Sequence, residues 1–345
     1  MNLFIKNLLP INWKYLENDD KIRVWYLNFM GKSPKPVVLN RKIEASRELG
    51  SLFGFWAGDG GKTVFTLVNT NPELLKKFYR IMQTIFGGIN FTLRLRIPPN
   101  FKTKQKNIVS RAQKLFLEIK DIKMSMCSRE KNFPIYILYN GSTIFIKLFK
   151  LLYEYFCENV KKDHPFWDGY IAGIIAAEGH MDLRKNYGTL SRISIAQTVE
   201  ATKKYICEAL DAREITYSEK KAYINIFGKR NYELIFQRDI FSLHSVKKKQ
   251  FIQGYEAITQ DQYSTNEIEG MILEKLKTPK RVSVLAKETD RCRQTIREHI
   301  LLKSKSLFMR GLLKVSGRER GTRGSFYGDL WVTTEKGLEY LTNIK

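Results

Sequence analysis

Apolar side chains recur along this chain at two spacings. A spacing near 3.6 residues predicts helices with one buried face, and strict alternation predicts strands with one buried face. A helix whose apolar positions continue through LFGFWAG ends at Gly60 and Gly61. The pattern then predicts a strand at 63–70, a helix at 73–86, a strand at 91–97, a helix near 109–121, a strand at 133–140 and a helix at 142–156.

A similar order of elements follows in the next hundred residues. The pattern predicts a helix at 168–179, a strand at 191–198, a helix near 200–210, a strand at 222–228 and a helix that ends near residue 242. Three pairs of segments echo one another: 160–170 with 246–255, 69–74 with 197–202, and 54–60 with 173–179. Diverged copies in one chain usually pack around a pseudo-twofold axis, so we predict a monomer with internal pseudo-twofold symmetry.

The two similar halves and a polar, turn-prone stretch, ITQDQYSTNE, divide the chain into five segments. The pattern of apolar positions changes after this stretch. We predict an N-terminal extension at 1–37, a first repeat at 38–159, a second repeat at 160–256, a linker at 257–266 and a separate C-terminal module at 267–345.

Charge narrows the class of partner. The 345 residues include 59 Lys and Arg against 35 Asp and Glu, a net charge of +24 that favours a polyanion such as nucleic acid. No stretch is long and apolar enough to span a membrane, and no export signal is apparent, so we expect a cytoplasmic protein with no membrane partner. The four Cys and four His residues are scattered without the spacing of a zinc site.

Two predicted helices share an unusual ending. Small residues recur four positions apart, Gly54 with Gly58 and Gly173 with Ala177, which lets two helices approach closely. Each helix then ends in an acid followed by Gly, at Asp59 and at Glu178. A carboxylate is unfavourable at the negative end of a helix unless a cation lies there, and oxygen ligands of this kind suit Mg²⁺.

These two segments resemble the motif that names the LAGLIDADG family of homing endonucleases. LFGFWAGDG at 52–60 and IAGIIAAEG at 171–179 place the acid and the final Gly in register, 119 residues apart. The sixth motif position, often acidic in the family, is Ala57 and Ala176 here. The resemblance covers about residues 38–256 and implies an α+β fold with two pseudo-symmetric αββαββα repeats that form a DNA-binding saddle.

The family resemblance also implies functional residues. Asp59 and Glu178, with the preceding residues Gly58 and Ala177, are the expected ligands of Mg²⁺ or Mn²⁺. A lysine near each catalytic centre corresponds to Lys161 and Lys247, in a register that is open by one residue to Lys162 and Lys248. Such a lysine would stabilise charge on the phosphate or orient the attacking water. The alternative is that these lysines are solvated or contact phosphates only.

Amides at the ends of two strands match a position that approaches metal-bound water in the family. They are Asn69 and Gln197, and helix capping is the alternative role for Asn69. Basic residues on predicted strands and loops would supply the DNA surface through phosphates or base edges, and each taken alone is equally explained as surface charge. They are Arg94, Arg96, Lys102, Lys104, Arg184, Lys185, Arg192, Lys220 and Lys221.

The segment after the linker has a different order, with three helices, a strand, a Gly- and Arg-rich hairpin, a strand and a short helix. It resembles a winged helix-turn-helix domain. Its second motif helix would present Arg293, Gln294, Thr295 and Arg297 to the major groove. Arg318, Arg320 and Arg323 would lie on the wing, near phosphates or the minor groove. A winged helix that binds protein is the alternative.

The sequence thus supports three functions. The first is a site-specific, metal-dependent DNA endonuclease, encoded as a free-standing homing enzyme, that cuts both strands of a long pseudo-palindromic target. The second is a non-cleaving DNA-binding transcriptional regulator on the same scaffold. The third is an RNA maturase that helps an intron fold, for which the same basic surface would serve. Acids retained at both motif ends favour the endonuclease.

Overall fold

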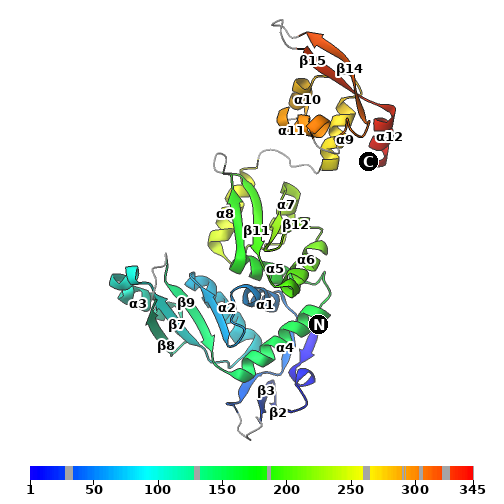
Figure 1. The fold of residues 1–345 in the computed structure, drawn as a ribbon. Coiled ribbons are helices and arrows are strands. Elements are labelled where there is room, and N and C mark those ends of the chain that lie inside the picture. The colour runs from blue at the N-terminus through cyan, green and yellow to red at the C-terminus, as the bar shows by residue number, and fades with distance from the viewer. Residues whose placement is uncertain are drawn as a thin grey trace. The chain divides into compact units, whose positions relative to one another are not determined.

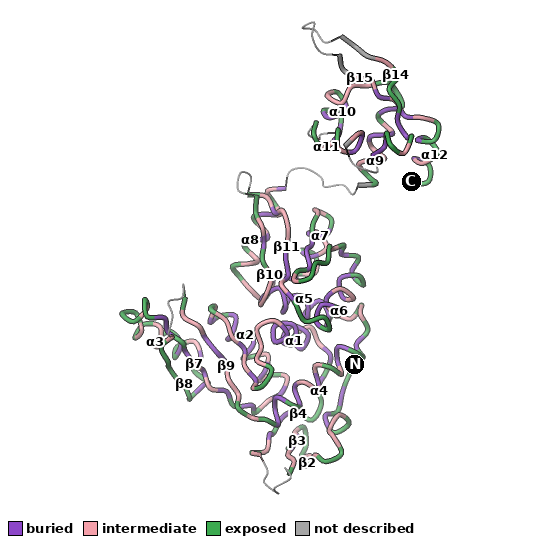
Figure 2. The backbone as a smooth tube through the Cα atoms, viewed as in Figure 1, coloured by how far each residue is buried: buried purple, intermediate pink, exposed green. Residues whose placement is uncertain are grey.

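The computed structural model describes residues 1–27, 34–127, 133–184, 188–258, 265–289, 291, 293–302, 306–320 and 327–344. The chain forms two compact units, Met1–Ile258 and Thr259–Lys345. The division between them in the sequence falls within the segment predicted as a linker. Each unit has its own hydrophobic core (Figure 2). Among the described residues, no helix has the length and apolar character needed to cross a membrane.

Two helices lie side by side at the centre of the first unit, α1 (Arg47–Asp59) and α5 (Pro165–Glu178) (Figure 1). Ser46 begins α1 because its side chain accepts a hydrogen bond from the Leu49 N–H at 3.1 Å. Pro165 suits the first turn of α5, where no backbone donor is needed. Nearly every side chain of both helices is buried, which is the pattern of a core helix and not of a surface helix.

The first half surrounds α1 with one mixed sheet and three further helices. Its strands lie in the order β6-β9-β7-β8, and β8 runs parallel to β7. Its elements after α1 are β6 (Phe65–Asn69), α2 (Pro72–Phe86), β7 (Thr92–Ile97), the 3-10 helix η2 (Pro99–Lys104), α3 (Gln105–Leu115), β8 (Ile122–Met126), β9 (Ile135–Asn140) and α4 (Thr143–Asn159).

The second half surrounds α5 with an antiparallel sheet in the order β10-β11-β13-β12. Its elements after α5 are β10 (Gly179–Leu183), β11 (Leu190–Ala196), α6 (Glu200–Asp211), β12 (Tyr217–Glu219), β13 (Tyr223–Ile226), α7 (Lys229–Gln237) and α8 (Ser245–Glu256). Through α7 this half has the expected αββαββα order.

The first half departs from that order in two places. Only one strand, β6, follows α1, because the hairpin partner is reduced to a single bridge between Gly60 and Leu67. The 3-10 helix, α3 and the parallel strand β8 are inserted between β7 and β9. The expectation of two αββαββα repeats is therefore wrong for the first half, although the overall class is mixed α and β as predicted.

The N-terminal segment forms small sheets of its own. Strands β2 (Trp13–Asn18), β3 (Lys21–Tyr26) and β4 (Val37–Asn40) make a three-stranded sheet. Strand β1 (Asn2–Phe4) pairs with β5 (Lys42–Glu44), and the 3-10 helix η1 (Ile5–Leu8) follows β1. The structure places the end of this segment after β5 and not at residue 37, because β4 and β5 complete its sheets.

The second unit has the element order that the pattern predicts. Its elements are α9 (Thr265–Lys275), α10 (Val282–Glu288), α11 (Arg293–Arg297), the π-helical turn η3 (Glu298–Leu302), β14 (Leu313–Arg320), β15 (Tyr327–Thr333) and α12 (Glu335–Ile344). Strands β14 and β15 pair antiparallel, and an isolated bridge joins Lys280 to Trp331 of β15. Leu285, Ile296 and Trp331 lie in its core.

Candidate functional site

Helices α1 and α5 contact each other through their backbones. A Cβ atom added at any of four glycines would lie 1.9–2.1 Å from a carbonyl oxygen of the other helix, which no side chain can do. The four contacts join Gly50 to Phe166, Gly54 to Tyr170, Gly169 to Arg47 and Gly173 to Ser51. The interior glycines that cost helix stability are therefore compensated by close packing.

The same contact continues to the ends that carry the acids. A Cβ at Gly58 would lie 2.7 Å from the Ala177 Cβ and 2.9 Å from the Glu178 Cγ. Asp59 and Glu178 both lie at C-terminal ends, and the negative charge of Glu178 acts on Asp59. The structure thus brings together the two acids that the sequence singles out.

The Asp59 carboxyl group lies where its charge is poorly compensated. Burial and, to a smaller extent, the neighbouring charge of Glu178 together raise its pKa to about 6. A hydrogen bond from the Asn69 Nδ2 to the Asp59 Oδ2, at 3.1 Å, and the charge of Lys247 act in the opposite direction. Asn69 also accepts from the Asn71 N–H at 2.9 Å, so it shapes the turn before α2 as well as contacting the acid.

Lys247 lies in the first turn of α8 and closes the C-terminal end of α5. Its Nζ donates to the carbonyl oxygens of Ile175 at 2.9 Å and Ala176 at 2.8 Å, and lies 3.4 Å from that of Ala177. Burial lowers the pKa of Lys247 to about 8, against the charges of Asp59 and Glu178, which raise it. This ammonium therefore lies close enough to both acids for their charges to act on it.

Gln197 occupies the position in the second half that Asn69 occupies in the first. The Gly after each acid, Gly60 or Gly179, pairs with the strand residue two positions before the amide, Leu67 or Ile195. Gln197 is 7% exposed, and its Oε1 accepts from the backbone N–H groups of the next two residues at 3.0 and 2.8 Å. Its side-chain oxygen is thus used to form a turn.

Lys161 does not lie near the acids, so its predicted place is wrong. It precedes the N-terminus of α5, whereas Glu178 is at the C-terminus, about 20 Å away at 1.5 Å per residue. Its neighbour Lys162 donates to the Cys157 carbonyl, and its Nζ lies 3.6 Å from the centre of the Trp167 ring. Moving the assignment by one residue, from Lys161 to Lys162, therefore does not place a lysine near the acids. Local sequence echoes matched these lysines, but Lys161 precedes helix α5, whereas Lys247 lies within the first turn of α8.

Sequence reasoning missed Lys62, which interacts with the end of α1. Its Nζ donates to the Trp56 carbonyl at 2.7 Å and lies 3.6 Å from the centre of the Trp56 ring. This places a cation at the negative end of α1, as Lys247 does for α5. The signal was present in the sequence as a lysine three residues after the acid, within the shortened hairpin.

The residues at the helix ends fit a divalent cation. Two carboxylates meet beside a backbone contact, and burial together with the charge of Glu178 raises the pKa of Asp59. Within the described residues, no group of three or more His, Cys, Asp or Glu forms a metal site, so further ligands would come from carbonyls, water or phosphate. The Ala177 carbonyl, one expected ligand, faces the Lys247 ammonium.

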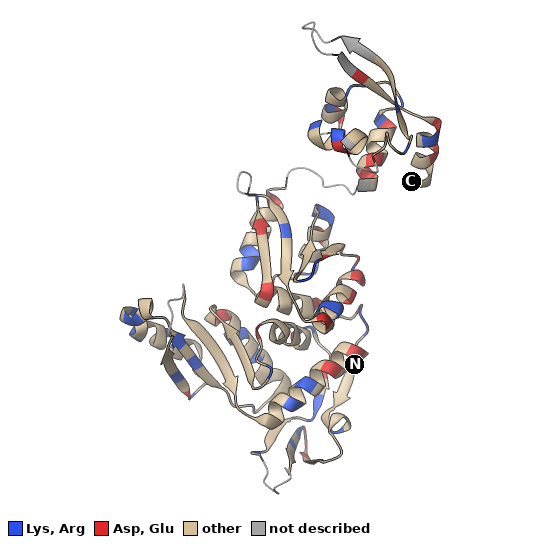
Figure 3. Ribbon diagram, in the orientation of Figure 1, with Lys and Arg blue, Asp and Glu red and all other residues tan. Residues whose placement is uncertain are grey.

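Each sheet has one face directed away from the central helices, and arginines lie on both of these faces. In β7, Leu93 and Leu95 are buried while Arg94 and Arg96 point to the other face, as alternation predicts. The Arg94 guanidinium lies 3.4 Å from the centre of the Tyr139 ring. Lys102 and Lys104 are exposed in the 3-10 helix that follows. Figure 3 marks the Lys and Arg positions of the chain in blue.

In the second sheet, Arg192 of β11 lies on the corresponding face and bonds to Asp182 of β10 at 2.5 Å. Arg184 is exposed just beyond β10, and Lys220 and Lys221 are exposed in the turn between β12 and β13. Lys185 lies outside the described residues. The expected basic residues that the structure describes thus occur on strands, next to strand ends or, for Lys102 and Lys104, in a 3-10 helix.

In the second unit, the helix expected to enter the groove is α11. Arg293, Gln294 and Arg297 are exposed, Thr295 is half-buried, and Ile296 is buried against the core. Arg318 and Arg320 belong to the end of β14, where the described structure is limited to the backbone, and Arg323 lies outside the described residues.

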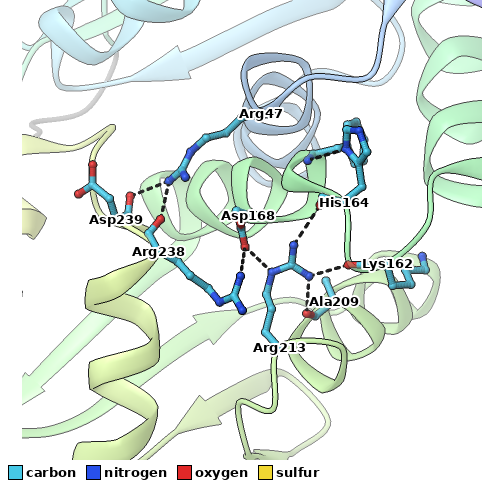
Figure 4. Close-up of polar contacts among 9 residues, drawn as sticks. Arg47, Lys162, His164, Asp168, Ala209, Arg213, Arg238 and Asp239 are labelled. Atoms are coloured by element: carbon cyan, nitrogen blue, oxygen red, sulfur yellow. Dashed lines mark hydrogen bonds and ion pairs between the residues drawn. The ribbon is translucent and has the colours of Figure 1, made fainter. Parts of the chain in front are cut away.

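A buried ion network fixes the opposite end of α5 (Figure 4). Arg213 donates to the Asp168 carboxylate and to the carbonyls of Lys162 at 2.7 Å, Ala209 at 3.0 Å and His164 at 3.1 Å. The Arg213 side chain is 1% exposed, so Asp168 is its essential counter-charge.

The same end of the helix pair also contacts the segment after α7 (Figure 4). Arg238 Nη1 lies 3.6 Å from the Asp168 Oδ1. Arg47, at the start of α1, donates to the carbonyls of Arg238 at 2.7 Å and Asp239 at 2.9 Å. These contacts hold the N-terminal ends of both central helices against one segment of the second half.

Comparison with known proteins gives distant structural similarities. No family profile matches this chain, and no curated protein matches it. A point variant of I-DmoI, solved with its target DNA and manganese, is 16% identical over 58% of this chain and 96% of its own, with a TM-score of 0.34. Full-length DUF199/WhiA from Thermotoga maritima is 8% identical over 74% of this chain and 89% of its own, with a TM-score of 0.37. Both likenesses are distant, so function must be argued from the site itself.

Proposed function

We propose that this protein is a metal-dependent DNA endonuclease of the LAGLIDADG type. The observation that carries the proposal is the meeting of Asp59 and Glu178 at the ends of two helices in backbone contact, with Lys247 beside both acids. The net charge of +24 and the polar faces of the two sheets suit a DNA duplex. Structural frameworks rarely place two carboxylates together at the negative ends of helices, because each arrangement costs stability.

Each residue at the site has a separate role in the proposed reaction. Asp59 and Glu178 would hold Mg²⁺ or Mn²⁺, and the metal would activate water and stabilise charge on the phosphate. Lys247 holds a positive charge beside the acids, where it stabilises a negatively charged phosphodiester. Asn69 orients the Asp59 carboxylate through its amide, and Gln197 fixes the matching turn in the second half.

The second unit is proposed as a winged helix-turn-helix domain that binds DNA. The order of such a domain is three helices followed by an antiparallel strand pair, with a bridging residue, here Lys280, between the first two helices. The exposed side chains of α11 would face base edges, and the arginines at the end of β14 would contact phosphates. It would add affinity to the endonuclease through a second contact with DNA.

A non-cleaving DNA-binding regulator is the second candidate. The observation that favours it is Lys247, whose ammonium already donates to the α5 carbonyls and partly neutralises the acids without a metal. In this case the acids and the lysine would form a structural cluster, and the sheets and the second unit would supply binding alone.

Cleavage of a randomised duplex library, read by sequencing, tests the two candidates. The natural protein with Mg²⁺ is compared with Asp59→Asn and Glu178→Gln variants, and binding is measured in parallel with EDTA. For the endonuclease we expect specific double-strand cuts that fall at least 100-fold in either variant while binding is retained. Specific binding with no cuts by the natural protein would support the regulator, and binding to no duplex would exclude both.

A further inference from the structure

The open face of the second sheet carries both donors and acceptors. Asp182 of β10 accepts from Arg192 of β11 at 2.5 Å and lies 3.1 Å from the His180 Nε2. On the same face, the Ser194 Oγ donates to the Asn225 Oδ1 of β13 at 2.8 Å, and both of these side chains are buried. The hydrogen bonds hold polar groups in fixed positions across three strands. Of these groups, the more exposed Asp182 and Arg192 are preorganised in a way that suits the reading of base edges.

The open face of the first sheet has a different chemistry. Its central strand, β9, presents Ile135, Ile137 and Tyr139, and Val68 of β6 lies opposite Ile137. Arg94 on this face is stacked on Tyr139. Among the strand residues that the structure describes, this face has no carboxylate and no amide side chain.

The difference limits which bases each face can distinguish. In the major groove, adenine and cytosine offer amino donors that side-chain acceptors such as Asn, Gln, Asp or Glu can read. Arginine reads guanine, and apolar side chains contact the thymine methyl group. The open face of the second sheet offers the Asp182 carboxylate and Arg192, whereas the described strand residues on the open face of the first sheet are only arginines, lysine, hydroxyls and apolar side chains.

The first half also loses sheet area near its acid and gains charge elsewhere. The hairpin β10–β11 extends from Gly179, next to the second acid, whereas the first half has only the Gly60 bridge there. Its insertion at 98–127 carries seven Lys and Arg against Glu118 and Asp121. Arg111 and Lys114 of α3 line an open hollow of about 410 Å³. Such side chains bind phosphates without regard to sequence.

We infer that the second sheet reads most of the target sequence, while the first sheet and its α3 insertion hold the other half-site mainly through phosphates. The inference rests on the proposed function as far as DNA binding, but not on cleavage. It means that the two half-sites carry unequal sequence information, although the central helices contact each other reciprocally.

Selection of bound duplexes from a library randomised over both half-sites tests this inference with the full chain in EDTA. We expect one half-site to be strongly specified and the other weakly. Arg192→Ala should relax one or two positions of the specified half by about 10-fold or more. Arg96→Ala, its matched control on the first sheet, should weaken all sequences alike. Arg111→Ala with Lys114→Ala should lower the slope of affinity against salt by about 2 without changing the selected sequence.

The outcomes separate the inference from the proposed function. Two equally specified halves would overturn the inference while DNA binding stands, and so would loss of the specified half with Arg96→Ala instead of Arg192→Ala. Absence of binding to any duplex would overturn the proposed function itself. The double variant Arg293→Ala with Arg297→Ala shows which base preferences come from the second unit. Preferences lost in this variant are assigned to that unit and not to either sheet. Unchanged melting temperatures confirm that each surface variant is folded.

Discussion

The two halves of the first unit share their central contact and little else. The contact of Gly50 with Phe166 has its counterpart in that of Gly169 with Arg47, each pair related by a shift of 119 residues. Around this contact, one half has a long hairpin next to its acid and the other has a single bridge. Backbone contact tolerates only glycine at these positions, whereas exposed strands and loops tolerate many sequences, so the interface is the more constrained part of the molecule.

The N-terminal ends of the central helices differ as well. The position of Asp168 in α5 corresponds to Leu49 in α1, again by a shift of 119 residues. Leu49 is fully buried among apolar side chains, while Asp168 is the counter-charge of the buried Arg213. The helices thus use apolar packing on one side and a buried ion network on the other to fix the same geometry.

The largest expected effect tests the shared contact. Gly54→Val and Gly173→Val should each destabilise the protein by more than about 4 kcal/mol, because the new side chain collides with a backbone carbonyl. Urea unfolding measures both variants. Gly317→Ala in the second unit, where a Cβ would lie 3.8 Å from its nearest neighbour, is the control. If the two variants lose markedly different amounts of unfolding free energy, the two sides of the helix contact are not equivalent.

The buried network should give the next largest effect, and only in the second half. Asp168→Asn leaves the Arg213 guanidinium buried without a counter-charge, which we expect to cost about 3–5 kcal/mol. Asp182→Asn removes a more exposed pair with Arg192 and should cost about 1 kcal/mol or less. Urea unfolding measures both variants. Equal losses of unfolding free energy would contradict the expectation that the buried ion pair is the more costly one to break.

Much of the site could be predicted because it depends on local sequence. Spacing four residues apart placed small residues on one face of each helix, and the acid before each final Gly fixed the charged ends. The open face of β7 also followed from alternation, which put Arg94 and Arg96 opposite the buried Leu93 and Leu95. In each case the relevant contacts are set by the period of a single element.

The departures involve contacts between elements that no single period determines. Lys161 and Lys247 have similar neighbours in sequence, but Lys161 precedes the start of α5, whereas Lys247 reaches the end of that helix from α8. The parallel strand β8 requires an insertion to bring it beside β7, and alternation does not report strand direction. The pairing of β1 with β5 likewise joins segments about 40 residues apart.

The lysines provide the third test of the difference between the halves. Lys247→Met should slow single-turnover cleavage by about 100-fold at saturating Mg²⁺, because the charge beside the acids is lost. Lys161→Met, which alters the segment at 160–170 that resembles the segment around Lys247, should leave the rate unchanged. Comparable binding of DNA by both variants is the control. A slow Lys161→Met variant with a normal Lys247→Met variant would reverse the assignment.

The smallest expected effect concerns the charge of Asp59. Its pKa is about 6 in the folded protein, above the ordinary value of 3.8, so the folded state binds the proton more tightly. This group therefore makes the protein less stable as pH rises from about 4 to 6, and the loss persists at higher pH. In EDTA, Asp59→Asn should be more stable than the parent by about 1–2 kcal/mol at pH 7.5, and not at pH 4. Mg²⁺ should recover that difference in the parent at pH 7.5 alone, because at pH 4 the proton competes for the carboxylate. If urea unfolding shows the same gain for Asp59→Asn at both pH values, the gain does not come from removing the buried charge of Asp59.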